Sequence, residues 1–285
     1  MDKLSSPKVL KEIITKYGFR FNKNLGQNFL IDSNVLDKIV SSAEIGENTG
    51  VIEIGPGIGV LTQALAEKAG KVVAIELDSH LLPILNETLG EYKNVKIINA
   101  DALKVDMNAI INNEFPNMDV KVAANLPYYI TTPIIMGLLE KKLNIDSIIV
   151  MVQKEVAERM AAKAGEKDYG ALSVAVQYFT KPCIIATVPP HCFMPQPKVE
   201  SVVIKLDILR QPPVEVEDEK KFFNVVKAAF GQRRKTLVNA LSNSGLFTMS
   251  KEQIKEMLIS IGIREDQRGE TLSIMQFAEL ANAIF

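Results

Sequence analysis

Residues Glu53–Gly59 read Glu-Ile-Gly-Pro-Gly-Ile-Gly, and they are the strongest indication of the fold. They begin inside the short apolar run Val51–Ile54 and lead directly into the helical pattern Ile58–Ala69. Glycines at a turn from strand to helix let the backbone bend sharply and let a ligand approach the main chain closely. The Gly-x-Gly-x-Gly spacing therefore indicates a loop for a nucleoside cofactor, with a tight turn that binds nothing as the simpler alternative.

Apolar runs and helical stretches alternate on the C-terminal side of this loop. Continuous apolar strands that alternate with helices predict a parallel sheet covered on both faces. Asp32 is the expected N-cap of a helix that precedes the sheet. Two later runs, Cys183–Val188 and Ser201–Ile208, predict an antiparallel pair at the sheet edge. The other expected strands are Val72–Leu77, Val95–Asn99, Val120–Ala124 and Ile145–Val152, and further helices are expected at Ser79–Leu89 and Gly170–Phe179.

The 285 residues exceed the usual size of one domain, so we expect a large domain and a small one. Residues 1–30 are polar and basic and form an N-terminal arm. Residues 31–209 contain the strand–helix alternation and form the main α/β domain. The proline-rich linker at 211–213 precedes a purely helical pattern, so residues 210–285 are predicted to form a helical C-terminal domain.

Charge is balanced over the whole chain but distributed unevenly. Lys plus Arg number 33 against 34 Asp plus Glu, whereas residues 1–29 carry a net +4 and residues 30–209 a net −6. No acid occurs in Phe222–Ser250, and Arg233, Arg234 and Lys235 stand there side by side. This cluster predicts contacts with RNA phosphates. A solvated cationic turn is the alternative.

Composition excludes several classes of protein. Two cysteines and two histidines exclude a disulfide framework and a zinc site built from Cys and His, so no metal is expected. The N-terminal residues contain no apolar segment typical of a signal peptide, which predicts a cytoplasmic protein. Val122–Leu139 is uncharged over 18 residues, but its prolines and polar side chains indicate a strand, a turn and a helix start, not a membrane span.

Acidic side chains stand at the ends of the next two expected strands. Glu76 closes the second strand, 21 residues after Gly55, where a carboxylate accepts hydrogen bonds from ribose hydroxyls. Asp101 follows the third strand and is placed to accept from an adenine amino group. Because the carboxyl ends of parallel strands lie at one edge of a sheet, these groups are expected around one ligand.

The fourth strand ends in Asn125-Leu126-Pro127-Tyr128, which indicates the chemistry. An exocyclic amine on a base is a poor nucleophile because its lone pair is delocalised into the ring. The Asn125 side-chain oxygen and the Leu126 carbonyl are predicted to accept the two N–H bonds of such an amine and to direct its lone pair at an electrophilic methyl group. Pro127 fixes the turn and Tyr128 offers a stacking face. An incidental asparagine in a turn is the alternative.

A second aromatic residue, Phe193, lies in the proline-rich segment Val188–Ser201. We predict that it faces Tyr128 and clamps an extruded base between the two rings. The alternative, which the spacing alone favours, is a hydrophobic plug beneath the loop.

Four segments together resemble the ribosomal RNA adenine N6-dimethyltransferases, and among them the bacterial small-subunit enzymes. They are Leu25–Leu30, Glu53–Gly59, Asn125–Tyr128 and Phe193–Ser201. The resemblance covers essentially the whole chain and implies a Rossmann-like class I S-adenosylmethionine-dependent methyltransferase with a helical, RNA-binding C-terminal domain. The cofactor contacts that it implies are Asn28, Leu30, Gly55, Glu76, Asp101 and Asn125.

The resemblance also implies a reaction. Methyl groups pass from S-adenosyl-L-methionine to N6 of two adjacent adenosines near the 3′ end of 16S rRNA, in four transfers. We also expect a role in small-subunit biogenesis, a monomeric state and a cytoplasmic location. The related 23S rRNA dimethylases usually have isoleucine where Leu126 stands, so the small-subunit substrate is favoured. A 23S enzyme, or an assembly factor that acts mainly by binding RNA, is the alternative.

Two other enzyme classes fit less well. An NAD-dependent dehydrogenase would place the third glycine one residue later and would leave Asn125–Tyr128 unexplained. A cytosine C5-methyltransferase needs a cysteine nucleophile. Cys183 begins a late strand, so we expect it to be a small buried hydrophobic residue instead.

Overall fold

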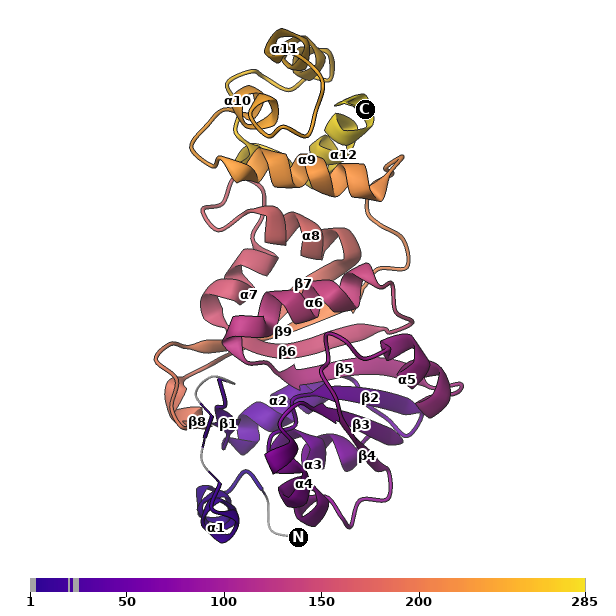
Figure 1. The fold of residues 1–285 in the computed structure, drawn as a ribbon, viewed down its shortest axis with the longest axis vertical. Coiled ribbons are helices and arrows are strands. Elements are labelled where there is room, and N and C mark those ends of the chain that lie inside the picture. The colour runs from indigo at the N-terminus through magenta and orange to yellow at the C-terminus, as the bar shows by residue number, and fades with distance from the viewer. Residues whose placement is uncertain (1–3, 20, 23–25, 285) are drawn as a thin grey trace. The chain divides into compact units, whose positions relative to one another are not determined.

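The computed structural model describes residues 4–19, 21–22 and 26–284, so Leu25 of the N-terminal motif lies outside the described residues. The chain divides into two compact units (Figure 1). The first contains Met1–Ala157 and Cys183–Ile208, and the second contains Glu158–Pro182 and Leu209–Phe285.

A seven-stranded sheet has the order β4-β3-β2-β5-β6-β9-β7. The five strands from β4 to β6 are parallel to their neighbours, and β9 runs antiparallel to β6, with Met151 opposite Val203. The predicted mostly parallel, Rossmann-like sheet with an antiparallel edge is therefore confirmed. The strands are β2 (Thr49–Ile54), β3 (Lys71–Glu76), β4 (Val95–Asn99), β5 (Asp119–Asn125), β6 (Ser147–Gln153), β7 (Thr180–Val188) and β9 (Ser201–Ile208).

Helices connect the successive parallel strands, as the alternation predicts. They are α3 (Val60–Ala66), α4 (Leu82–Thr88), α5 (Met107–Glu114) and α6 (Thr131–Glu140). A further helix, α2 (Ser33–Ser42), precedes the sheet. The Asp32 carboxylate accepts a hydrogen bond from the Val35 amide at 3.1 Å, so the predicted N-cap is confirmed.

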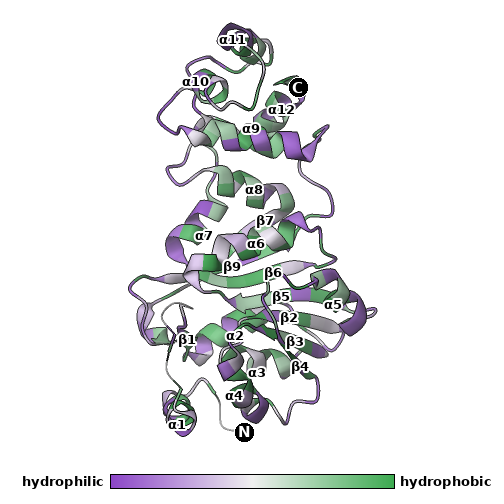
Figure 2. Cartoon of the chain, viewed as in Figure 1, coloured by the Kyte–Doolittle hydropathy of each residue, from purple (hydrophilic) through white to green (hydrophobic). Residues whose placement is uncertain are grey.

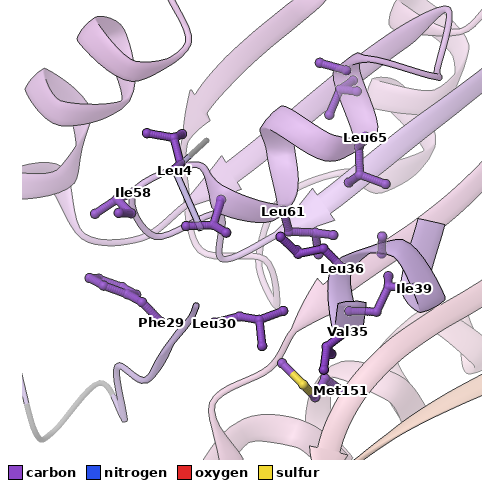
Figure 3. Close-up of a cluster of buried hydrophobic side chains, with 14 of the residues drawn as sticks. Leu4, Phe29, Leu30, Val35, Leu36, Ile39, Ile58, Leu61, Leu65 and Met151 are labelled. Atoms are coloured by element: carbon purple, nitrogen blue, oxygen red, sulfur yellow. The ribbon is translucent and has the colours of Figure 1, made fainter. Parts of the chain in front are cut away.

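Both faces of the sheet are buried along its central strands β2, β3 and β6. Val51 and Val72 belong to one hydrophobic cluster with side chains of α2 and α3, such as Leu36 and Leu65 (Figure 3). The next residues along these strands are also fully buried, and side chains alternate between the faces of a strand. They therefore pack on the opposite face. Figure 2 shows the resulting run of hydrophobic residues along β6.

The N-terminal arm is more structured than its polar composition indicates. Helix α1 (Pro7–Tyr17) buries Leu10 and Ile13, and the Lys16 ammonium lies 2.6 Å from the Glu87 carboxylate on α4. After it, β1 (Phe29–Leu30) pairs antiparallel with β8 (Phe193–Met194). This two-residue pairing joins segments far apart in sequence, and no hydrophobic alternation is long enough to reveal it.

The second unit is helical apart from the first residues of β7. It contains α8 (Ala171–Phe179), α9 (Glu219–Gly231), α10 (Leu237–Ser242), α11 (Lys251–Ser260) and α12 (Ile274–Ile284). Residues 158–182, which the predicted domain 31–209 included, belong to this unit because Tyr169, Val174 and Tyr178 pack in its core. The Tyr178 and Phe222 rings, for example, lie 4.9 Å apart.

Candidate active site

A cavity lies in the first unit where the parallel strands end. It is lined by the glycine loop after β2, by the ends of β3 and β5, by the segment after β4 and by the Gly26–Leu30 segment. All six residues predicted to contact the cofactor line it: Asn28, Leu30, Gly55, Glu76, Asp101 and Asn125. Leu126, Pro127 and Tyr128 line the same cavity. The topology thus gathers residues that lie up to a hundred positions apart.

Glu76 is held in place by the main chain. Its two carboxylate oxygens accept hydrogen bonds from the Gly57 amide at 3.2 Å and the Asp78 amide at 2.8 Å. Burial raises the pKa of Glu76 above its ordinary value, while the two amide bonds act in the opposite direction. A carboxylate has about four acceptor positions, so capacity for ligand hydroxyls remains.

The glycine loop requires glycine at Gly57. Its φ of +61° lies in the left-handed region, and a Cβ built there would lie 2.8 Å from the Phe29 ring. The Phe29 ring also stacks with Phe19, with ring centroids 6.0 Å apart. The loop therefore packs directly against the N-terminal segment, which brings Asn28 and Leu30 to the cavity.

Asp101 is half-buried at the cavity. One of its oxygens accepts from the Leu103 amide at 3.0 Å, and the other lies 3.4 Å from the Lys104 ammonium. These contacts fix the carboxylate on the turn after β4.

Asn125 is oriented by a single hydrogen bond. Its Nδ2 donates to the Asn28 main-chain carbonyl at 2.9 Å. Because the amide nitrogen is engaged there, the amide oxygen is left as the acceptor of this side chain. This is the orientation that the predicted amine-acceptor role requires.

Tyr128 is also fixed. Its hydroxyl lies 2.7 Å from the fully buried Ser201 hydroxyl, and burial raises the pKa of the tyrosine. The contact links the Asn-Leu-Pro-Tyr turn to the end of the proline-rich segment. The Leu126 side chain beside it is buried, and its amide donates to the Met151 carbonyl at 3.2 Å.

Phe193 does not line the cavity. It is only 2% exposed and pairs with Leu30 in the β1–β8 ladder. It also packs in the hydrophobic cluster that contains Leu30 and Leu36. This position favours a hydrophobic plug. The predicted clamp against Tyr128 would need Phe193 to leave the core.

Glu53 lines the cavity, although its position in the sequence had suggested no role separate from the glycine motif. It is 1% exposed, and its Oε2 has no hydrogen-bond partner within the described residues. Burial, with a contribution from Glu76, raises the pKa of Glu53 to about 8. A cofactor that brings a donor or a positive charge into this cavity suits such an orphaned carboxyl group. The only signal in the sequence was its place at the head of the glycine motif.

Cys183 was expected to be buried, and this was wrong. The thiol is exposed, on edge strand β7, and the residue does not line the cavity. A nucleophilic role in a cytosine C5-methyltransferase therefore has no support.

The predicted phosphate-contacting cluster lies in the second unit, in the turn between α9 and α10. Arg233 is engaged within the protein, because its guanidinium lies 3.1 Å from Glu270 and donates to the Lys167 carbonyl. Arg234 and Lys235 are exposed, and the described contacts give their side chains no partner.

The described part of the chain contains neither a membrane-spanning helix nor a cluster of metal ligands. No helix among these residues is long and apolar enough to cross a membrane. Nor do residues 4–19, 21–22 and 26–284 bring together three or more His, Cys, Asp or Glu side chains as a metal site would.

Solved structures of similar fold define the class of protein. A dimethyladenosine transferase from Plasmodium falciparum has a TM-score of 0.74 and 27% sequence identity, over 88% of this chain and 95% of that one. The 23S rRNA methyltransferase ErmE has a TM-score of 0.69 and 25% identity, over 90% of this chain and 99% of its own. Together with the cavity at the strand ends, they define a Rossmann-like methyltransferase.

Sequence comparison gives the family. The model of the ribosomal RNA adenine dimethylase family matches residues 18–284. The ribosomal RNA small subunit methyltransferase A of Alkaliphilus oremlandii is 57% identical over 99% of this chain and 98% of its own length. The ribosomal RNA small subunit methyltransferase A of Bacillus cereus strain B4264 is 54% identical over 100% of this chain and 98% of its own length. The chain belongs to the ribosomal RNA adenine dimethylase family.

Proposed function

We propose that this protein transfers methyl groups from S-adenosyl-L-methionine to N6 of two adjacent adenosines near the 3′ end of 16S rRNA in the small ribosomal subunit. Four transfers give two N6,N6-dimethyladenosines. The observation that carries the proposal is the Asn125 side chain, whose nitrogen is bound to the Asn28 carbonyl at 2.9 Å and whose oxygen is therefore the free acceptor. The small subunit is favoured because the two relatives named above are small-subunit methyltransferases, and the chain matches them over nearly their full length.

The cavity residues suit the cofactor. Glu76 would accept hydrogen bonds from the ribose hydroxyls, and Asp101 from the adenine amino group. The Gly55 loop, Asn28 and Leu30 would enclose the remainder of the cofactor, with the Glu53 carboxyl beside it. When bound, the cofactor supplies an electrophilic methyl group on a sulfonium.

The protein's part in the chemistry is to bind and orient the target amine. The Asn125 oxygen and the Leu126 carbonyl would accept hydrogen bonds from its N–H groups, two in the first transfer to each adenosine and one in the second, which moves the nitrogen towards tetrahedral geometry and directs its lone pair. Each N–C bond formed would replace one N–H bond, whose proton passes to solvent, and the methyl–sulfur bond that breaks would leave a neutral thioether. Tyr128, fixed by Ser201, stacks on the base. Acceptors already in position need no reorganisation during the reaction, which is why such groups have large effects on rate. Stacking by Phe193 stays a prediction, because its burial supports the plug instead.

RNA recognition outside the cavity would use the second unit. Arg234 and Lys235 are free to contact phosphates, whereas Arg233 orders the turn through Glu270. We propose a monomeric protein that acts on the subunit in the cytoplasm, needs no metal and contributes to small-subunit biogenesis.

Transfer from methyl-labelled cofactor tests the proposal. Unmethylated small subunits should accept about four methyl groups each, and large subunits none. Label on the large subunit would support the 23S alternative. Tight binding to the small subunit without any transfer would indicate an assembly factor that only binds RNA.

A further inference from the structure

Tyr129 is an exposed aromatic residue at the edge of the cavity. It directly follows Tyr128 and lines the same cavity, yet 57% of it is exposed. Only a few large apolar side chains of the described chain are this exposed, and most of the tyrosine and phenylalanine rings are buried or half-buried. The Tyr129 ring is therefore accessible to a ligand beside the amine-binding turn.

The local geometry separates the two tyrosines. Both lie in the 3₁₀ turn Tyr128–Ile130, where successive residues point about 120° apart because each turn contains about three residues. Tyr128 is fixed in one direction by its hydrogen bond to Ser201. The side chains of Tyr128 and Tyr129 therefore leave the turn in different directions.

Gly26 of the N-terminal segment lies close to the Tyr129 ring. Gly26 has a φ of +58°, and a Cβ built there would lie 3.5 Å from Tyr129 Cδ1 and 3.4 Å from Pro127 Cβ. The N-terminal segment thus passes close to the ring and to the turn, while 57% of Tyr129 stays exposed. An aromatic ring with an open surface is what stacking on a base needs.

The chemistry of base extrusion indicates the occupant. Enzymes that act on a base remove it from its stack, so the nucleotide beside it loses a stacking partner. Stacking on an aromatic side chain replaces that loss and tolerates any base. We infer that Tyr129 stacks on the nucleotide adjacent to the target adenosine, as a substrate-binding residue separate from Tyr128. This inference rests on the proposed action on RNA adenosines.

The test is single-turnover methylation of unmethylated small subunits, with the protein in excess. The protein is in excess over the subunits but below the concentration that saturates binding. Under these conditions Tyr129→Ala should lower the observed rate constant by about 5-fold to 150-fold, which corresponds to the free energy lost when one base no longer stacks. Tyr129→Phe keeps the ring and should stay within about 2-fold of wild type. Ile184→Ala, which truncates an exposed side chain of the same unit away from the cavity, is the matched control.

Two further substrates identify the nucleotide that Tyr129 contacts. They are small subunits reconstituted with an abasic nucleotide either on the 5′ side or on the 3′ side of the target adenosine. With one of these two substrates, wild type and Tyr129→Ala should become equal, because there is no base left to stack. A defect of Tyr129→Ala that persists on both abasic substrates would overturn the inference. So would a Phe variant as slow as the Ala variant, which would indicate a contact through the hydroxyl.

Two controls keep the outcome interpretable. If Tyr129→Ala lowers the unfolding temperature, Tyr129→Leu retains bulk against Gly26 without a ring, and it should show the same rate loss. If wild-type protein methylates no small subunits, the proposed function itself has failed. If wild type methylates and Tyr129→Ala matches it, only the role of Tyr129 is lost.

Discussion

Asn125 and Asn28 are joined by a hydrogen bond of 2.9 Å, from a side-chain amide at the end of β5 to a main-chain carbonyl 97 residues earlier. The bond fixes which end of the Asn125 amide is free. The N-terminal segment therefore contributes to the amine site through its backbone, in addition to lining the cavity.

Removal of the Glu76 carboxylate should weaken cofactor binding. A hydrogen bond to a charged group contributes about 1.5–3 kcal/mol, so Glu76→Ala should lower the affinity for S-adenosylmethionine by about 10-fold to 150-fold. Isothermal titration calorimetry measures this directly. Glu91→Ala, which removes an exposed acid outside the cavity, serves as the control. Wild-type affinity in Glu76→Ala would remove Glu76 from the site.

Glu53 should make stability depend on pH. Burial raises its pKa in the folded protein to about 8 from 4.5, so the unfolded chain releases this proton at a lower pH than the folded protein does. Stability should then fall as pH rises between about 4.5 and 8. The amide of Glu53→Gln does not ionise, so the variant should gain about 3 kcal/mol relative to wild type between pH 5 and pH 8. Urea unfolding at several pH values measures the difference, and parallel curves would contradict it.

Phe193 should matter for stability. It is 2% exposed, so Phe193→Ala should lower the free energy of unfolding by about 3–5 kcal/mol through the cavity that it leaves. Chemical denaturation measures this loss. Phe193→Leu separates the two roles, because leucine fills the core but cannot stack. We expect near-normal methylation from it, whereas a rate loss without a stability loss would favour the clamp.

Arg234 and Lys235 should contribute to binding of the small subunit. Each phosphate contact releases counterions, so Arg234→Glu/Lys235→Glu should lower affinity and flatten its dependence on salt. Arg233 is left unchanged because it is paired with Glu270. Filter binding at several salt concentrations provides the measurement, with Lys251→Glu as a control in the same unit. The affinity for S-adenosylmethionine should not change. If the double variant binds the small subunit with wild-type affinity and wild-type dependence on salt, the turn is an ordinary solvated surface.

The sequence predicted the parts of the site that depend on strand order. Glu76, Asp101 and Asn125 each end or follow an apolar strand, and parallel topology brings such positions to one edge. It did not reveal the β1–β8 pairing, which spans two residues per strand, and so it left both the clamp and the plug open for Phe193. Tertiary packing also divides the chain differently from the boundary predicted at residues 209 and 210. Tyr169 and Tyr178 follow the strand–helix alternation in sequence but pack in the helical unit.

The proposed function depends on activation of adenine N6 of the small-subunit rRNA by Asn125. Mass spectrometry of nuclease-digested 16S rRNA, after single-turnover reaction of unmethylated small subunits with wild type or Asn125→Ala, tests it most directly. We expect wild type to give two adjacent N6,N6-dimethyladenosines near the 3′ end, and Asn125→Ala to form them about 10²–10³ times more slowly while it remains folded. Dimethyladenosine formed at a near-normal rate by Asn125→Ala would rule out this role of Asn125, and no dimethyladenosine from wild type would rule out the proposed reaction.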